Sequence, residues 1–107
     1  MKLINKLVLT TVIAGVSASC FAISDSAKLG ANAGAMSYCS KHFPDGNETT
    51  YKLLKLKTTK EFGDLDEGTK LKAMVYKKAA EDGDYLGDPL NKSRCNKLRK
   101  MLHVKYN

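Results

Sequence analysis

Histidine is scarce in this sequence, and sequence motifs of catalysis are absent. The chain of 107 residues contains two histidines, His42 and His103, and neither lies in a recognised catalytic or metal-binding motif. There is no Gly-rich phosphate loop and no nucleophile elbow. The acidic clusters "GDLDEG" and "EDGD" lack the closing glutamate of a calcium-binding loop. We therefore expect no catalytic residues, no cofactor and no metal, and we do not expect an enzyme.

The sequence also lacks an apolar run long enough to cross a bilayer. The longest run, residues 7–16, has about half of the roughly 20 residues that a membrane-spanning helix requires. It follows Lys2 and Lys6 and precedes the small residues "SAS", an order that is typical of a secretory signal. We predict a signal peptide over residues 1–22, cleaved after Ala22, and a single helical domain over residues 23–107. The predicted location is periplasmic or secreted.

Cys20 leaves a second interpretation of this N-terminal segment open. The letters "SASC" resemble a bacterial lipoprotein box in which Cys20 is acylated, and the protein would then be an outer-membrane lipoprotein. Ser17 occupies the position where such boxes usually have leucine or another aliphatic residue. This favours ordinary cleavage, which discards Cys20.

The remaining cysteines, Cys39 and Cys95, form an even pair without a Cys-x-x-Cys motif. In a protein exported to an oxidising space, such a pair predicts a disulfide rather than two redox-active thiols. The bridge would close a long loop and stabilise the fold by roughly 4 kcal/mol on the chain-entropy account.

Strand-like alternation, internal repeats and linkers are absent, and the apolar spacing predicts four helices. The first begins near Ser24 or Ser26 and ends near His42, the second covers residues 50–62, the third begins at Asp64 or Asp66 and stops at Gly83, and the fourth covers residues 92–104. We expect Gly63 to end the second helix as a left-handed cap. The predicted fold class is all-α, a small bundle of about four short helices clamped by one disulfide.

The helices also carry predictions about which faces are buried. In the first helix, Gly30 and Gly34 share a face with neighbouring alanines, so we expect another helix of the chain to cross closely there. In the second and third helices, the residues expected to point toward the core are Tyr51, Leu53, Leu54, Leu56, Phe62, Leu71, Met74, Val75 and Ala79.

Basic side chains are concentrated near the C-terminus. The whole chain has a formal net charge of +7, and residues 89–107 carry six basic side chains and no acid. One interpretation is the solvated side of the last helix, whose apolar side would be formed by Cys95, Leu98, Met101 and Leu102. The alternative is a surface that binds a partner or makes weak contact with an anionic membrane. Nucleic acid is not expected as a partner of an exported protein.

The segment "YLGDPL" places large apolar residues in a short, turn-rich connection beside Cys95. These side chains either cover one end of the core or form a docking patch for a partner peptide or helix. The candidate partner-binding residues of this loop and of the last helix are Tyr85, Leu86, Leu90, Arg94, Lys97, Arg99 and Lys100.

The order of these features resembles a known family. A first helix ending in "YC", a Pro/Asp break, two middle helices, a Pro-containing turn, a second cysteine and the final "LRKML" are similar to the helical pilotins of bacterial type II secretion. The resemblance covers residues 36–102 and lies in architecture and cysteine placement. Pilotins are small disulfide-clamped bundles that bind a secretin segment and guide it to the outer membrane.

The resemblance implies an adaptor that binds another envelope protein. The same outline fits acid-stress chaperones with one disulfide and periplasmic immunity proteins that neutralise a toxin. The alternative function is therefore a periplasmic protective protein.

Overall fold

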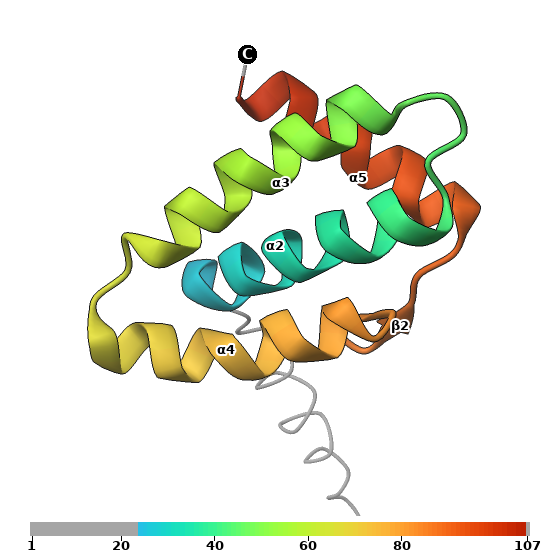
Figure 1. The fold of residues 1–107 in the computed structure, drawn as a ribbon. Helices are drawn as coiled ribbons and strands as arrows, with labels where there is room; N and C mark the ends of the chain where they lie inside the picture. Colours follow the sequence, from blue (N-terminus) through green and yellow to red (C-terminus); the bar gives the residue numbers. More distant parts are fainter. Residues whose placement is uncertain (1–23, 107) are drawn as a thin grey trace, which may run out of the picture.

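The computed structural model describes residues 24–106, and this part of the chain folds into four α-helices and one small hairpin (Figure 1). The elements are α2 (Asp25–His42), α3 (Glu48–Gly63), α4 (Glu67–Glu81), β1 (Asp84–Tyr85), β2 (Asp88–Pro89) and α5 (Lys92–Lys105). Helix α2 lies between α3 and α4, and α5 packs near the C-terminal end of α2. The expected all-α bundle is confirmed. The predicted signal peptide and Cys20 lie outside the described residues.

Capping side chains explain where three of the helices begin. Ser24 accepts a hydrogen bond from the Ala27 amide, Asp66 from the Thr69 amide and Asn91 from the Arg94 amide. Each side chain satisfies a first-turn amide that has no partner within its helix. The sequence predicted a start near Ser24 or Ser26, one at Asp64 or Asp66 and one at residue 92, and the structure selects Ser24 and Asp66 from the two pairs. Helix α3 begins at Glu48, two residues earlier than predicted.

The prediction that Gly63 forms a left-handed cap is wrong. Gly63 is the last residue of α3, and Asp64 follows it in right-handed helical geometry. The Asp64 amide donates to the carbonyls of Lys60 and Glu61, so the chain leaves the helix without a left-handed residue. Gly83, with a φ of 97°, does adopt the left-handed conformation after α4.

Helix α2 is the centre of the bundle because its small residues allow a close approach of α4. A Cβ atom at Gly30 would lie 2.4 Å from the Ala73 carbonyl oxygen, and one at Gly34 would lie 2.1 Å from the Lys77 carbonyl oxygen. Both distances are far below van der Waals contact, so only glycine fits at these two positions. The predicted tight crossing is confirmed, and α4 is the helix that makes it.

This crossing also corrects the predicted inner face of α4. Ala73 and Ala80 are buried against α2, whereas Leu71 and Val75 are 70% and 67% exposed and Met74 and Ala79 are half-buried. Larger residues cannot point toward a helix that approaches so closely, so the alanine side of α4 faces inward.

Helix α3 differs from the prediction in the same way. Tyr51, Leu54 and Phe62 are buried as expected, but Leu53 and Leu56 are 46% and 70% exposed. The buried residues recur every three or four positions and define one narrow stripe. Leu53 and Leu56 lie outside that stripe, on the solvent side of the helix.

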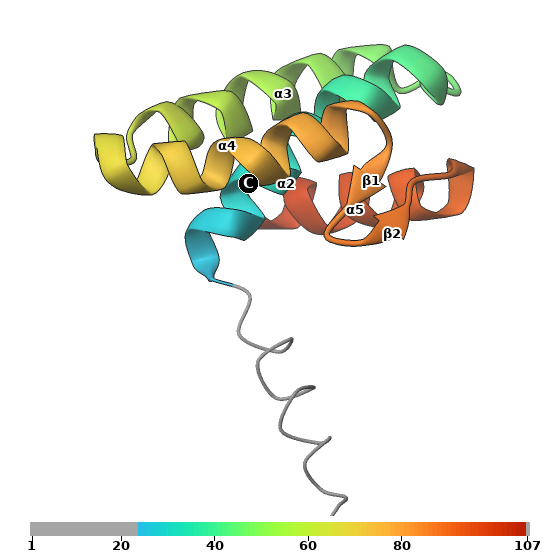
Figure 2. The ribbon, with the colours of Figure 1, turned by 90° about the horizontal axis from the view of Figure 1, so that it is seen from below.

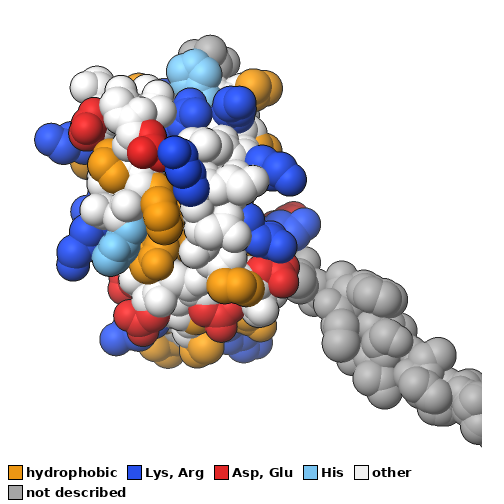
Figure 3. All heavy atoms as spheres, turned by 90° about the vertical axis from the view of Figure 1, so that its right-hand side faces the viewer, with side chains coloured by type: hydrophobic (Ala, Val, Ile, Leu, Met, Phe, Trp, Pro, Cys, Tyr) orange, Lys and Arg blue, Asp and Glu red, His pale blue; other side chains and the backbone are white. Residues whose placement is uncertain are grey.

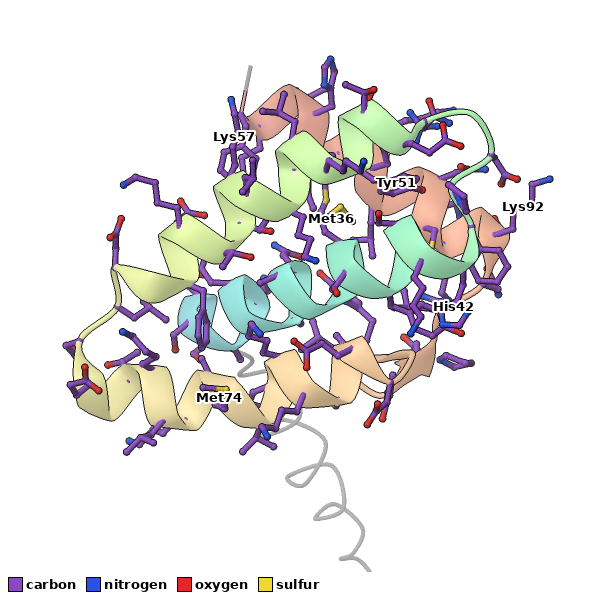
Figure 4. The ribbon with its side chains drawn as sticks, in the orientation of Figure 1. Met36, His42, Tyr51, Lys57, Met74 and Lys92 are labelled. Carbon is purple, nitrogen blue, oxygen red and sulfur yellow. A yellow bond between two sulfur atoms is a disulfide. The ribbon has the colours of Figure 1, made fainter. Side chains whose placement is uncertain are left out.

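The largest core cluster lies where α2, α3 and α5 meet. Met36 from α2 and Tyr51 from α3 lie in this region (Figure 4), together with Leu98 and Leu102 from α5. The buried disulfide between Cys39 and Cys95 joins the end of α2 to the start of α5, which confirms the predicted pairing.

The segment expected to be a loop contains a two-stranded hairpin, in which Tyr85 pairs with Asp88. Its turn residues Leu86 and Gly87 have φ values of 51° and 96°, the left-handed pair that a tight hairpin turn requires. The hairpin lies between α4 and α5 (Figure 2).

Among the described helices, none combines the length and apolarity needed to cross a membrane. The disulfide is compatible with export to an oxidising compartment.

Candidate functional site

A small apolar hollow lies where the hairpin meets α5. It has a volume of about 150 Å³ and is lined by Tyr85, Leu90, Arg94, Lys97, Leu98 and Met101. An apolar space of roughly this volume accommodates a benzene-sized group. The hollow can therefore receive one aliphatic or aromatic side chain of a ligand.

A second, larger hollow of about 500 Å³ lies beside the first. Most of its lining comes from the N-terminal half of α2, with Lys28 and Asn32, and from the C-terminal half of α5, with Lys105; Glu61 of α3 lies at its edge. Tyr85 and Met101 line both hollows, so the two hollows adjoin at this pair. We call the combined surface the Tyr85 groove.

Tyr85 is held in place at the centre of the groove. Its hydroxyl donates a hydrogen bond of 2.6 Å to Asn32 Oδ1 on α2, and its ring packs against the main core cluster. Burial of the side chain raises the pKa of the Tyr85 hydroxyl above its ordinary value, so the hydroxyl stays protonated and continues to donate. Tyr85 thus covers the core and lines the groove at the same time.

The rim of the smaller hollow is cationic. Arg94 lies 3.6 Å from the Asp88 carboxylate, whereas no ion pair of Lys97 is found among residues 24–106. Figure 3 shows the end of the molecule where α5 begins, with Lys and Arg side chains, several acidic side chains and small apolar areas between them. An apolar hollow with such a rim suits a ligand that carries both an apolar group and negative charge.

The structure brings together four of the seven predicted partner-binding residues. Tyr85, Leu90, Arg94 and Lys97 line the same hollow. Leu86 is half-buried at the hairpin turn and packs against the core, and the exposed Lys100 lines neither hollow.

Arg99 does not belong to this groove. Its guanidinium lies 6.0 Å from the centre of the Tyr51 ring on α3, and its Nε atom is buried without a hydrogen-bond partner. The pKa of the Tyr51 hydroxyl is raised, mainly by burial. The half-buried Arg99 thus places its guanidinium near an α3 aromatic side chain rather than in the groove.

Sequence reasoning missed much of the lining of the larger hollow, including Met101 and Asn32. One of the two interpretations of the basic C-terminal segment placed Met101 on the apolar side of the last helix with Leu98 and Leu102, but Met101 is 53% exposed and lines both hollows. It lies at the edge of the buried stripe of α5, where helical spacing alone does not decide between core and surface. Asn32, the partner of Tyr85, is a buried amide among glycines and alanines, and a buried amide signals a hydrogen-bond partner elsewhere in the fold.

The two histidines lie apart from the groove. His42 stacks against Tyr38 with ring centres 4.3 Å apart, and His103 is exposed on α5. Within the described part of the chain, no three His, Cys, Asp or Glu side chains are close enough to hold a metal ion.

No protein-family model matches this chain, and comparisons with curated proteins and with solved structures find no significant match.

Proposed function

We propose that the protein is an exported adaptor that binds a segment of another envelope protein in the Tyr85 groove, in the manner of the pilotins that its sequence resembles. The observation that carries the proposal is the small hollow with an apolar lining and a cationic rim. A bound segment places one large apolar side chain against Tyr85, Leu98 and Met101. Its flanking Asp or Glu residues face Arg94 and Lys97.

The way the groove is supported favours binding without rearrangement. The disulfide fixes the start of α5 to α2, and the Tyr85 hydroxyl fixes the hairpin to the same helix. Both walls of the smaller hollow are therefore attached to α2. A surface that is ordered before binding loses less conformational entropy on association, which strengthens the affinity for a short segment.

The proposal is tested by selecting a displayed random peptide library against the mature protein and measuring the affinity of the enriched peptides. We expect these peptides to combine one large apolar residue with neighbouring Asp or Glu. Met101→Glu should weaken their binding by about tenfold or more, because it places a negative charge in the hollow that receives the apolar group.

The matched control is Val104→Glu, the same charge change on α5 at a residue that is 75% exposed and lines neither hollow. This variant should keep wild-type affinity. Equal losses in both variants, or enriched peptides without an acidic and apolar pattern, would contradict the proposal.

Capture from an envelope fraction with wild-type protein and the Met101→Glu variant then identifies the partner class. A secretin that is retained by the wild type and lost with the variant supports the pilotin-like role. A cell-wall hydrolase with the same dependence supports a protective, toxin-neutralising role instead.

A further inference from the structure

The solvent side of α3 carries two exposed leucines that no described element covers. Leu53 is 46% exposed and Leu56 is 70% exposed. Lys52, Lys55 and Thr59 join Leu56 around a shallow hollow of about 350 Å³. We call the surface formed by Lys52, Leu53, Lys55 and Leu56 the α3 face.

The charge of the α3 face is positive and not neutralised within the described residues. The ion pairs of residues 24–106 include neither Lys52 nor Lys55. On α5, Lys92, Arg94 and Lys105 lie within 4 Å of an acidic side chain, whereas Lys97 and Lys100 form no ion pair among residues 24–106 and serve below as the comparison for the α3 face. The lysines of the α3 face are therefore available to an external anion.

We propose that the α3 face binds the surface of an anionic lipid bilayer. Lysine side chains can lie along apolar groups with their stems while the ammonium groups reach lipid phosphates. Leu53 and Leu56, between these lysines, can enter the boundary between headgroups and acyl chains, as the apolar side of an interfacial helix does.

The same observations disfavour protein occupants of this face. A second copy of the chain would bring two positively charged faces together, and like charges across an interface are repulsive. A stable protein interface generally buries about 1,200–2,000 Å² and is enriched in aromatic anchors. The α3 face has two leucines and no aromatic residue.

The test measures sedimentation of the mature protein with vesicles of phosphatidylcholine alone and with vesicles that also contain phosphatidylglycerol. We expect binding to the anionic vesicles only, and loss of this binding at high salt. Lys52→Gln/Lys55→Gln should weaken the partition by about thirty-fold, because each lysine near an anionic surface contributes about fivefold. Leu56→Gln should weaken it by about tenfold, since the glutamine has no apolar end to insert.

Two variants serve as matched controls. Lys97→Gln/Lys100→Gln removes the same charge from α5, and Leu71→Gln makes the same change at an equally exposed leucine of α4. Both should bind the vesicles much as the wild type does. Circular dichroism checks that every variant is folded, which is expected because the altered side chains are exposed.

Three results would overturn the proposal. The first is no binding to anionic vesicles at low salt, and the second is equal binding to vesicles without phosphatidylglycerol. The third is an equal loss in the α5 control, because net charge rather than the α3 face would then account for the binding. The groove variant Met101→Glu does not alter the α3 face, so the two proposals can fail independently.

Discussion

Gly30 and Gly34 set the distance between α2 and α4, because the side chains they lack leave room for the backbone of α4. At Gly34 the nearest obstacle to a Cβ atom is the carbonyl oxygen of Lys77, which belongs to a helix backbone and cannot rotate aside. The close approach in turn decides that Ala73 and Ala80 face inward. Two missing side chains thus determine the inner surface of a neighbouring helix.

Gly34→Ala should therefore destabilise the protein although alanine is the better helix former. Overpacking generally costs about 1–3 kcal/mol, and the intrinsic gain from replacing glycine in a helix is at most about 1 kcal/mol. We expect the free energy of unfolding in urea to fall by about 2 kcal/mol.

The control for this change is Gly68→Ala in α4, where a Cβ atom would meet only Asp66 Oδ1 at 3.8 Å. This variant should be as stable as the wild type or slightly more stable. If Gly34→Ala behaves like Gly68→Ala, the account of the crossing is wrong.

Helix α5 is attached to the rest of the bundle at both of its ends. The disulfide holds its first turn to α2. At the other end, the Tyr106 hydroxyl donates a hydrogen bond to Glu61 on α3, Lys105 lies 3.5 Å from the same carboxylate, and Lys57 donates to the Tyr106 carbonyl. Since α5 forms one wall of the Tyr85 groove, these contacts position the candidate binding surface.

Because of the contact between Tyr106 and Glu61, the stability of the protein should fall as the pH rises through the alkaline range. Burial and the neighbouring Glu61 carboxylate raise the pKa of the Tyr106 hydroxyl well above its ordinary value. In the unfolded chain this hydroxyl ionises near about pH 10. The stabilisation is therefore fully present below about pH 10 and is lost as the pH rises toward the higher pKa of the folded state.

Urea unfolding at neutral pH and above about pH 10 checks this expectation. Tyr106→Phe should be less stable than the wild type at neutral pH, and the difference should shrink at the alkaline pH. Taking the difference between the two proteins at each pH removes the pH effects that both proteins share. A difference that stays constant over this range would contradict the raised pKa.

The elements show how far the sequence could predict the fold and the site. Helix starts were predictable because Ser24, Asp66 and Asn91 act locally, within one turn of their own helix. The inner faces of α3 and α4 were not, because helical spacing allowed several apolar stripes and a contact with α2 selected one of them.

In the candidate site, too, local features were predictable from the sequence, whereas features set by contacts between helices were not. Tyr85 and Leu90 were identified because large apolar residues in a short connection are conspicuous in the sequence. Met101 was assigned to the core because it neighbours the buried Leu98 and Leu102 along α5. Its place in the groove depends on how α5 is rotated against α2, which the contacts between the two helices determine.

On the scale of the whole molecule, the two proposed surfaces use different residues. The Tyr85 groove is built from α2, the hairpin and α5, with Glu61 from α3 at its edge. The α3 face consists of Lys52, Leu53, Lys55 and Leu56. A protein that binds lipid through one surface and a partner segment through the other would keep that partner close to a membrane, as an assembly adaptor requires.

The central claim is that the Tyr85 groove binds a partner segment, and it is tested most directly by amide NMR shifts of a ¹⁵N-labelled protein that spans residues 23–107. The ligand for this titration is the tightest peptide from the library selection. We predict that the largest shifts cluster at Tyr85, Leu98 and Met101 and are absent in the Met101→Glu variant. Shifts centred on α4 or on the α3 face, with the groove unchanged, would contradict the account.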